Sequence, residues 1–312
     1  MEEALKHVVI TGATSMLGVA LLHKCLEEGT RVYAVARPGS RNMRRLPAHD
    51  AVTVVECENS ALASLPAWIT ERGFDAFYHF SWDGTSRNMR GDPFVQEANV
   101  HDSLQAVAAA NELGCAAFIG AGSQAEYGRV QGRIAPDTCA RPEYAYGMAK
   151  LAAAGLCGQL CEKLGMRYVW GRVFSVYGEY DNSDTLVSYL INALFAGEVP
   201  ALTECGQMWD YLYAGDAAEA FYKLGEKGSG IYCIGSGQVR PLREYVEIIR
   251  SLICPQARLG FGEKPYAPNQ VMHLNADIAS LQKDTGFHPR TDFAAGVAKT
   301  IEWWKKEHGK KD

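Results

Sequence analysis

The stretch HVVITGATSMLG, residues 7–18, decides the fold that we expect for this chain. Its first half is a short apolar run typical of a buried strand, and the residues after it have helical spacing. Gly12 ends the strand, where glycine permits a tight turn, and Gly18 falls where a side chain would push the helix off the sheet. Backbone N–H groups at such a helix start would face a pyrophosphate. The predicted loop residues are Gly12, Thr14, Ser15, Met16, Leu17 and Gly18.

Apolar runs and helical segments continue to alternate along the first part of the chain, which predicts an α/β fold with a doubly wound parallel sheet of the Rossmann type. The predicted strands are Val8–Thr11, Arg31–Ala36, Val52–Glu56, Ala76–Phe80, Ala116–Gly120 and Tyr168–Arg172. The clearest helices are Leu17–Glu28, Phe94–Leu113 and Ala145–Leu164.

The alternation becomes irregular after Val176. Thr185–Ala196 and Pro241–Leu252 have helical patterns, and Gly230–Ile234 predicts a short strand. We expect a dinucleotide-binding domain over residues 1–175 and a smaller C-terminal substrate lobe over residues 176–312. The second lobe is expected to interleave with the last strands and helices of the first.

Composition excludes several classes of function. The 312 residues carry a formal net charge of −5 without a broad basic surface, so we do not expect a nucleic-acid partner. No run of about 18 apolar residues occurs, which argues against a membrane span and favours a cytoplasmic location. The nine cysteines contain no CxxC pair, and Cys157 with Cys161 would make only half a site. We expect core or surface thiols and no metal.

The second strand indicates the cofactor. NAD sites place a carboxylate roughly 20 residues after the glycine loop, on the ribose 2′-hydroxyl, whereas a 2′-phosphate is bound by arginine. Here the stretch RVYAVARPGSRN, residues 31–42, has no acid at its end and offers Arg37, Ser40 and Arg41. This composition predicts NADP(H), with NAD possible. A solvated basic loop is the alternative.

A second group of residues predicts proton chemistry. Ser123 follows the fifth strand, and YAYGMAK places Tyr146 and Lys150 on one face of a helix. A phenol with its usual pKa of about 10 needs a nearby cation to act as a base. Lys150 would supply that charge and bind the nicotinamide ribose, Ser123 would hold the substrate oxygen, and Tyr146 would move the proton.

With these residues the chain resembles the extended short-chain dehydrogenases/reductases, the NAD(P)-dependent nucleotide-sugar epimerase/dehydratase family. Further matching segments are YHFSW, EANVHDS, RVFSVYG and WDYLYAGDAAEA, which contains Asp216. The resemblance implies that Phe80, Ser81, Asn99 and Phe174 contact the cofactor, together with Arg37, Tyr146 and Lys150. It also implies a nucleotide-activated sugar between the lobes and a homodimer built through a four-helix bundle of helices 94–113 and 145–164.

Departures from the family pattern narrow the range of activities that we expect. Ser15 replaces the middle glycine of the loop, and a serine hydroxyl can still donate to a phosphate. Sugar 4,6-dehydratases resembling this chain have acids directly after the catalytic serine or threonine, where this sequence has Gln124 and Ala125. Glu126, one position further, is expected to be a surface residue. A sugar 4-epimerase or a 4-keto reductase remains, and the basic residue Arg37 favours the reductase.

Two further departures concern the residues that would bind the diphosphate of the substrate. Trp209 and Ala267 stand where relatives have arginines that bind the diphosphate. The cations that would replace those arginines are Arg87, Arg90, Arg240, Arg243 and Lys264. Two alternative functions therefore stay open, an NADPH-dependent carbonyl reductase of non-sugar substrates and a non-catalytic NADP(H)-sensing regulator.

Overall fold

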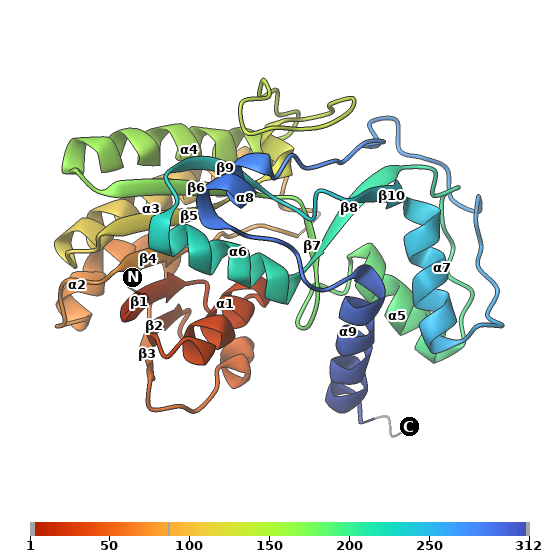
Figure 1. Cartoon of the computed structure of the whole chain (residues 1–312), viewed down its shortest axis with the longest axis horizontal. Helices are drawn as coiled ribbons and strands as arrows, with labels where there is room; N and C mark the ends of the chain where they lie inside the picture. The colour runs from red at the N-terminus through yellow and green to blue at the C-terminus, as the bar shows by residue number, and fades with distance from the viewer. Residues whose placement is uncertain (1–3, 87, 310–312) are drawn as a thin grey trace.

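A seven-stranded parallel sheet forms the larger part of the protein, in a computed structural model that describes residues 4–86 and 88–309 (Figure 1). Its strand order β3-β2-β1-β4-β5-β6-β9 runs outward from β1 in both directions, which is the doubly wound topology expected from the sequence. The strands are β1 (His7–Thr11), β2 (Arg31–Ala36), β3 (Val52–Glu56), β4 (Ala76–His79), β5 (Ala117–Ser123), β6 (Arg167–Val173) and β9 (Gly230–Ile234).

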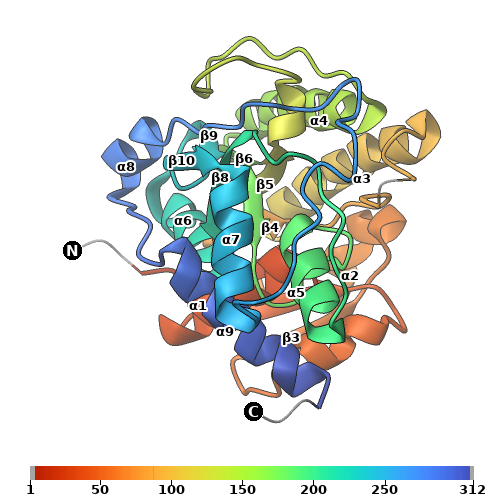
Figure 2. The same ribbon diagram turned by 90° about the vertical axis from the view of Figure 1, so that its right-hand side faces the viewer.

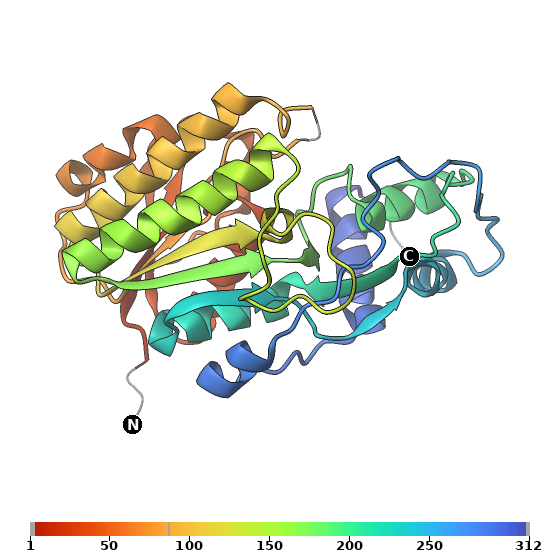
Figure 3. The same cartoon turned by 90° about the horizontal axis from the view of Figure 1, so that it is seen from above.

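Helices cover both faces of this sheet, so its strands are buried on both sides (Figure 3). One face carries α1 (Met16–Glu27), α6 (Ala214–Lys227) and the short α8 (Ala279–Thr285). The other carries α2 (Leu65–Trp68), α3 (Pro93–Glu112) and α4 (Ala145–Leu164). Short 3₁₀ turns lie at Arg41–Arg45, Asn59–Ser64 and Gln124–Glu126.

A smaller lobe lies beyond the carboxyl ends of the strands. Its three-stranded sheet has the order β10-β8-β7, from β7 (Ser175–Tyr177), β8 (Met208–Tyr213) and β10 (Val239–Pro241). Helices α5 (Leu186–Ala196), α7 (Leu242–Ile253) and α9 (Phe293–Glu307) pack around a separate apolar core (Figure 2). Between β8 and β10 the chain returns to the large sheet as α6 and β9, so the two lobes interleave.

The predicted elements agree closely with the structure, and two differences matter. The fifth strand extends to Ser123, so this residue ends β5 instead of following it. The strand Gly230–Ile234 pairs with β6 and completes the large sheet.

Two expectations from composition concern cysteines and membrane spans. Cys157 and Cys161 on α4 are fully buried against the sheet. None of the helices in the described ranges is long and apolar enough to cross a membrane.

Gly12 shows why the loop after β1 needs glycine. Its φ of +66° lies in the left-handed region, and a Cβ there would meet the backbone N of Ser81 at 2.6 Å. At Gly18 a Cβ would collide with the carbonyl oxygen of Gly12. These contacts bring the loop, the start of α1 and the end of β4 together without space for side chains.

We predict that Gly12→Ala lowers the free energy of unfolding by about 3 kcal/mol, because left-handed strain adds to a backbone collision. Gly29→Ala is the matched control. Gly29 has φ +75° but nothing within 4 Å of its Cβ position, so only the strain of about 1 kcal/mol applies. Denaturant titration of both variants checks this. Equal losses would show that the approach to Ser81 does not constrain the loop.

Candidate active site

The structure brings Ser123, Tyr146 and Lys150 together at the carboxyl end of β5. Ser123 ends the strand, and Tyr146 and Lys150 occupy the first two turns of α4. The Ser123 hydroxyl lies near enough to the Tyr146 phenol to lower its pKa by hydrogen bonding, and the Lys150 ammonium donates to the carbonyl oxygen of Ala121 at 2.7 Å. A hydroxyl, a phenol and an ammonium therefore share one site, as the spacing predicted.

Lys150 is unusual for a lysine because it is only 4% exposed. Its Nζ lies 3.5 Å from the centre of the Trp82 ring and 5.9 Å from that of Trp170. Burial lowers the pKa of Lys150 to about 7, although the charge of Glu126 acts in the opposite direction. The group can thus change its charge near neutral pH.

Burial has the opposite effect on Tyr146, because it disfavours the phenolate and raises the pKa of the phenol. The guanidinium of Arg90, 5.1 Å from the ring centre, and the hydrogen bond with Ser123 both act to lower that pKa. The Trp82 ring meets the Tyr146 ring edge-on at 6.1 Å. At neutral pH Tyr146 is a protonated phenol that can donate to an oxygen.

The expectation that Glu126 is a surface residue is wrong. Its side chain is completely buried and forms an ion pair of 2.6 Å with Arg172. Its other oxygen accepts from the backbone N–H of Ser123 at 2.8 Å and from the Trp170 indole at 3.0 Å. A carboxylate with all these partners holds structure together and does not face the substrate as a free acid or base.

A cavity of about 270 Å³ lies between the loop after β1 and the ends of β2 and β4. Of the predicted cofactor residues, those that line it are Gly12, Thr14, Ser15, Arg37, Phe80 and Ser81. Ser15 also caps α1, since its hydroxyl oxygen accepts from the N–H of Gly18 at 3.0 Å. The first N–H groups of α1 have no acceptor within the helix and suit an anion. The residues present therefore fit a dinucleotide.

Arg37 meets an acid that the sequence did not indicate. Its Nη1 lies 3.2 Å from Asp83, which also accepts from the Asn59 amide at 2.9 Å. Asp83 and Trp82 follow β4 directly and line the same cavity. Their place after a buried strand was the available signal, because residues at the carboxyl ends of parallel strands form ligand sites.

Other predicted cofactor residues make different contacts. Asn99 bonds the backbone N–H and carbonyl of Asp83, which fixes the segment after β4. Phe174 is buried in the main core, where its N–H donates to Ile234. Leu17 packs against the same core. Asn99, Phe174 and Leu17 therefore do not line the cavity between the loop after β1 and the ends of β2 and β4.

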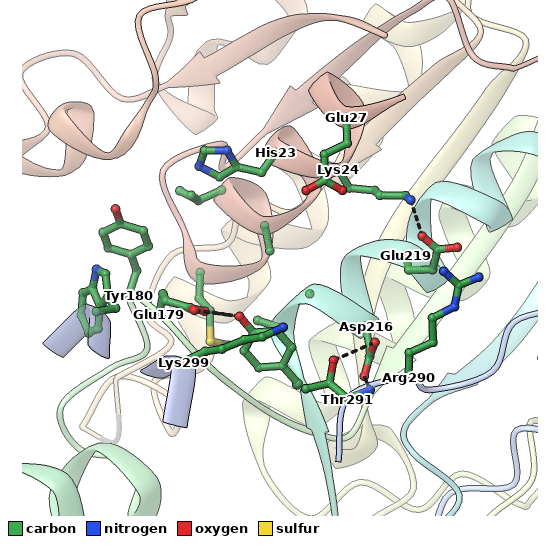
Figure 4. Close-up of a pocket in the computed structure, with 17 residues that line it drawn as sticks. His23, Lys24, Glu27, Glu179, Tyr180, Asp216, Glu219, Arg290, Thr291 and Lys299 are labelled. Carbon is green, nitrogen blue, oxygen red and sulfur yellow. Dashed lines mark hydrogen bonds and ion pairs between the residues drawn. The ribbon is translucent and has the colours of Figure 1, made fainter. Parts of the chain in front are cut away.

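Met16 lines a second cavity of about 560 Å³, between α1, the start of α6 and α9 (Figure 4). Figure 4 shows polar residues that bond one another there. Lys24 pairs with Glu219 at 2.5 Å, and the Thr291 N–H donates to Asp216 at 2.9 Å. Ser123, Tyr146 and Lys150 do not line this cavity.

The two residues at the expected arginine positions differ in their surroundings. The Trp209 indole donates to the Ser175 hydroxyl at 2.8 Å, whereas Ala267 is exposed. Among the suggested replacements, Arg243 lies over Phe261, Lys264 lies over Tyr189, and Arg240 is exposed on β10. Arg87 lies outside the described residues. Arg90 is the replacement that contacts the Ser123–Tyr146–Lys150 cluster, through Tyr146.

The sequence of the chain matches a known protein family and several known proteins. The model of the NAD dependent epimerase/dehydratase family matches residues 8–235. The chain is 23% identical over 315 residues to an uncharacterized UDP-glucose epimerase YtcB of Bacillus subtilis (strain 168), covering 95% of this chain and 97% of that protein. It is also 23% identical over 318 residues to a dTDP-glucose 4,6-dehydratase of Streptomyces griseus, covering 96% and 94%.

A solved structure shares the fold. The UDP-N-acetylglucosamine 4-epimerase from Methanobrevibacter ruminantium M1, in complex with UDP-N-acetylmuramic acid, superposes with a TM-score of 0.88 at 20% identity, covering 98% of this chain and 100% of that one. The predicted Rossmann fold is thereby confirmed, and the family match confirms an NAD-dependent enzyme of the epimerase and oxidoreductase type. The chain belongs to the NAD dependent epimerase/dehydratase family.

Proposed function

We propose that the protein is an NADP(H)-dependent reductase of a 4-keto nucleotide sugar. The observation that carries this proposal is the cluster of Ser123, Tyr146 and Lys150 beside the dinucleotide cavity, in which Ser123 and Lys150 are buried and Tyr146 is partly buried. Trp82 connects the two, because its ring contacts Tyr146 and Lys150 and lines the cavity. The three residues after Ser123 supply no free acid for dehydration, since Gln124 and Ala125 are neutral and Glu126 is engaged by Ser123 and Arg172.

The residues of the chain would handle the oxygen of the substrate. A bound nicotinamide dinucleotide supplies the hydride that adds to the carbonyl carbon. Ser123 donates a hydrogen bond to the carbonyl oxygen, and Tyr146 gives this oxygen its phenolic proton as the C–H bond forms. The Lys150 ammonium stabilises the resulting phenolate, which is reprotonated from solvent. The raised pKa of Tyr146 supports this direction, because it keeps the phenol protonated beforehand.

Arg37 supports NADP(H) over NAD(H). It lies at the end of β2, lines the cavity, and pairs with Asp83 in a contact that leaves both side chains about half exposed. A 2′-phosphate would replace that carboxylate with a stronger, bidentate partner. A cell uses this cofactor mainly for net reduction, which agrees with a reductase.

A 4-epimerase is the second candidate, favoured by the names of the UDP-glucose epimerase and the UDP-N-acetylglucosamine 4-epimerase to which the chain is similar. It would use the same three residues for the proton, while hydride would leave one carbon of the sugar for the bound cofactor and return to the same carbon. Residues 1–175 would hold the cofactor, and the part of residues 176–312 that forms the smaller lobe would supply most of the substrate contacts.

A ligand screen tests the function. Thermal shift and calorimetry would compare NAD⁺, NADP⁺ and their reduced forms, each alone and then with UDP-, CDP-, dTDP- and GDP-sugars. We expect NADP(H) to bind best and one nucleotide class to add a further shift. Cofactor binding with no response to any sugar nucleotide would favour the non-sugar carbonyl reductase. In that case Trp209 and Ala267, which stand where relatives have diphosphate-binding arginines, would indicate a substrate other than a nucleotide sugar.

We propose that the protein acts in the cytoplasm as a homodimer through α3 and α4. These helices pack side by side on the outside of the large sheet (Figure 3). They expose apolar side chains, with Phe94 85%, Met148 52% and Leu156 49% exposed. We predict that light scattering gives a dimer and that Phe94→Glu with Leu156→Glu gives a folded monomer. A wild-type monomer would contradict this interface.

We predict that Tyr146→Phe lowers turnover by a factor of about 10² or more, because the proton donor is lost while the ring remains. Cofactor affinity should stay close to that of the wild type. Tyr144→Phe is the matched control, because Tyr144 lies two residues earlier and is half exposed. Wild-type turnover in the Tyr146 variant would show that the assigned chemistry is wrong.

We predict that Arg37→Ala weakens NADP(H) binding about tenfold or more and weakens NAD(H) binding little, because only NADP(H) carries the phosphate. Arg31→Ala controls for loss of charge, since Arg31 begins the same strand and pairs with Glu71. Calorimetry measures both cofactors with each variant. Equal losses for the two cofactors would remove the argument for NADP(H).

A further inference from the structure

Glu126 is a buried acid directly behind the catalytic cluster, and the proposed reaction does not use it. It follows β5 by three residues and forms a reciprocal cap with Ser123. The Glu126 carboxylate accepts the Ser123 N–H, and the Ser123 hydroxyl accepts the Ala125 N–H at 3.2 Å. The turn that presents the Ser123 hydroxyl is therefore closed by this one carboxylate.

The carboxylate is itself fixed from β6. The Arg172 guanidinium binds it at 2.6 Å, donates to the Pro136 carbonyl at 3.0 Å and lies over the Tyr127 ring. The Trp170 indole donates the third bond at 3.0 Å. Gly122 provides space for this arrangement, because a Cβ there would collide with the indole and reach Glu126 at 2.6 Å.

The same indole connects Glu126 to Lys150. One edge of Trp170 bonds the carboxylate, and the ring centre lies 5.9 Å from the Lys150 ammonium. Lys150 also bonds the carbonyl of Ala121, two residues before Ser123 on β5. The carboxylate and the ammonium thus flank one aromatic ring, in a region almost without solvent.

Apart from Glu126 and the arginines, the titratable groups that the described residues place next to Lys150 on β4, α4 and β6 carry no charge at neutral pH. The guanidinium of Arg90 lies over the Tyr146 ring. On β4, burial and the nearby Lys150 lower the pKa of His79 to about 3, which leaves the imidazole neutral. On α4, burial raises the pKa of Cys157 to about 12, and it also raises the pKa of Tyr146. On β6, burial raises the pKa of Tyr168 far above its usual range. Arg172 is a fixed cation on the far side of Glu126.

We propose that Glu126 is a positioning residue of the active site, whose buried carboxylate fixes the turn that carries Ser123 and supplies the negative charge that faces the Lys150 ammonium. This role rests on the proposed function only insofar as Ser123 and Lys150 act in catalysis. The charge matters because the ammonium is desolvated, and an opposite charge in low dielectric favours its protonated form.

The test is an NMR titration of Lys150 in the protein without cofactor, using ¹³C-labelled lysine. Lys150→Met assigns the signal. In the wild type the midpoint should lie near 7, and in Glu126→Gln it should move to lower pH, because the amide keeps the shape but removes the charge. Asp210→Asn is the matched control. Asp210 is equally buried, on β8, and its carboxylate accepts from Ser236 and Gly237.

The outcomes distinguish a role of Glu126 in positioning the active site from a role in the stability of the fold alone. We expect both variants to unfold at lower temperature but only Glu126→Gln to move the Lys150 midpoint. With an active substrate, the alkaline limb of kcat should shift in the same direction, with a loss of about tenfold on that limb. A midpoint unchanged from the wild type would overturn the proposal.

A variant that removes both charges covers the case in which Glu126→Gln fails to fold. A single change leaves the Arg172 guanidinium buried without its partner, which is more costly than removing the pair. Glu126→Gln with Arg172→Gln should therefore fold and still lower the Lys150 midpoint. Because the titration needs neither cofactor nor turnover, its result is independent of whether the proposed reaction is correct.

Discussion

Keeping a lysine ammonium buried beside a phenol is the physical constraint on which this site depends. Removing Lys150 from water favours its neutral form, so the surrounding structure must compensate with specific contacts. The Ala121 carbonyl, the faces of Trp82 and Trp170, and the charge of Glu126 provide these contacts. Space for the Trp170 ring comes from Gly120 and Gly122 on β5, where a Cβ would collide with that ring.

The same parallel sheet links the catalytic cluster to the cofactor cavity. The loop after β1, the segment after β4 and the end of β5 all lie at the carboxyl edge, where ligands bind in doubly wound folds. Trp82 belongs to both parts, since it lines the cavity and contacts Lys150, and Asp83 beside it lines the cavity and pairs with Arg37. In the proposed reaction, hydride and proton would thus be handled within one continuous site.

Local patterns predicted much of this architecture. Strand and helix periodicity predicted the seven strands of the large sheet and the main helices on its faces, and a spacing of four residues placed Tyr146 and Lys150 on one helix face. The errors concern contacts between distant segments. Glu126 is 46 residues from Arg172 and Arg37 is 46 residues from Asp83. No local pattern indicates such pairs, because they depend on which strands become neighbours.

The most direct test of the central claim is transfer of deuterium from NADPH that carries deuterium at both C4 positions of the nicotinamide to a 4-keto nucleotide sugar. The account predicts one deuterium per product molecule, bound to C4 of the sugar, with an equal amount of NADP⁺ formed. Absence of deuterium at C4 with every 4-keto sugar of the UDP, CDP, dTDP and GDP series would contradict it. That result would leave a Rossmann protein whose buried lysine and tyrosine serve another substrate.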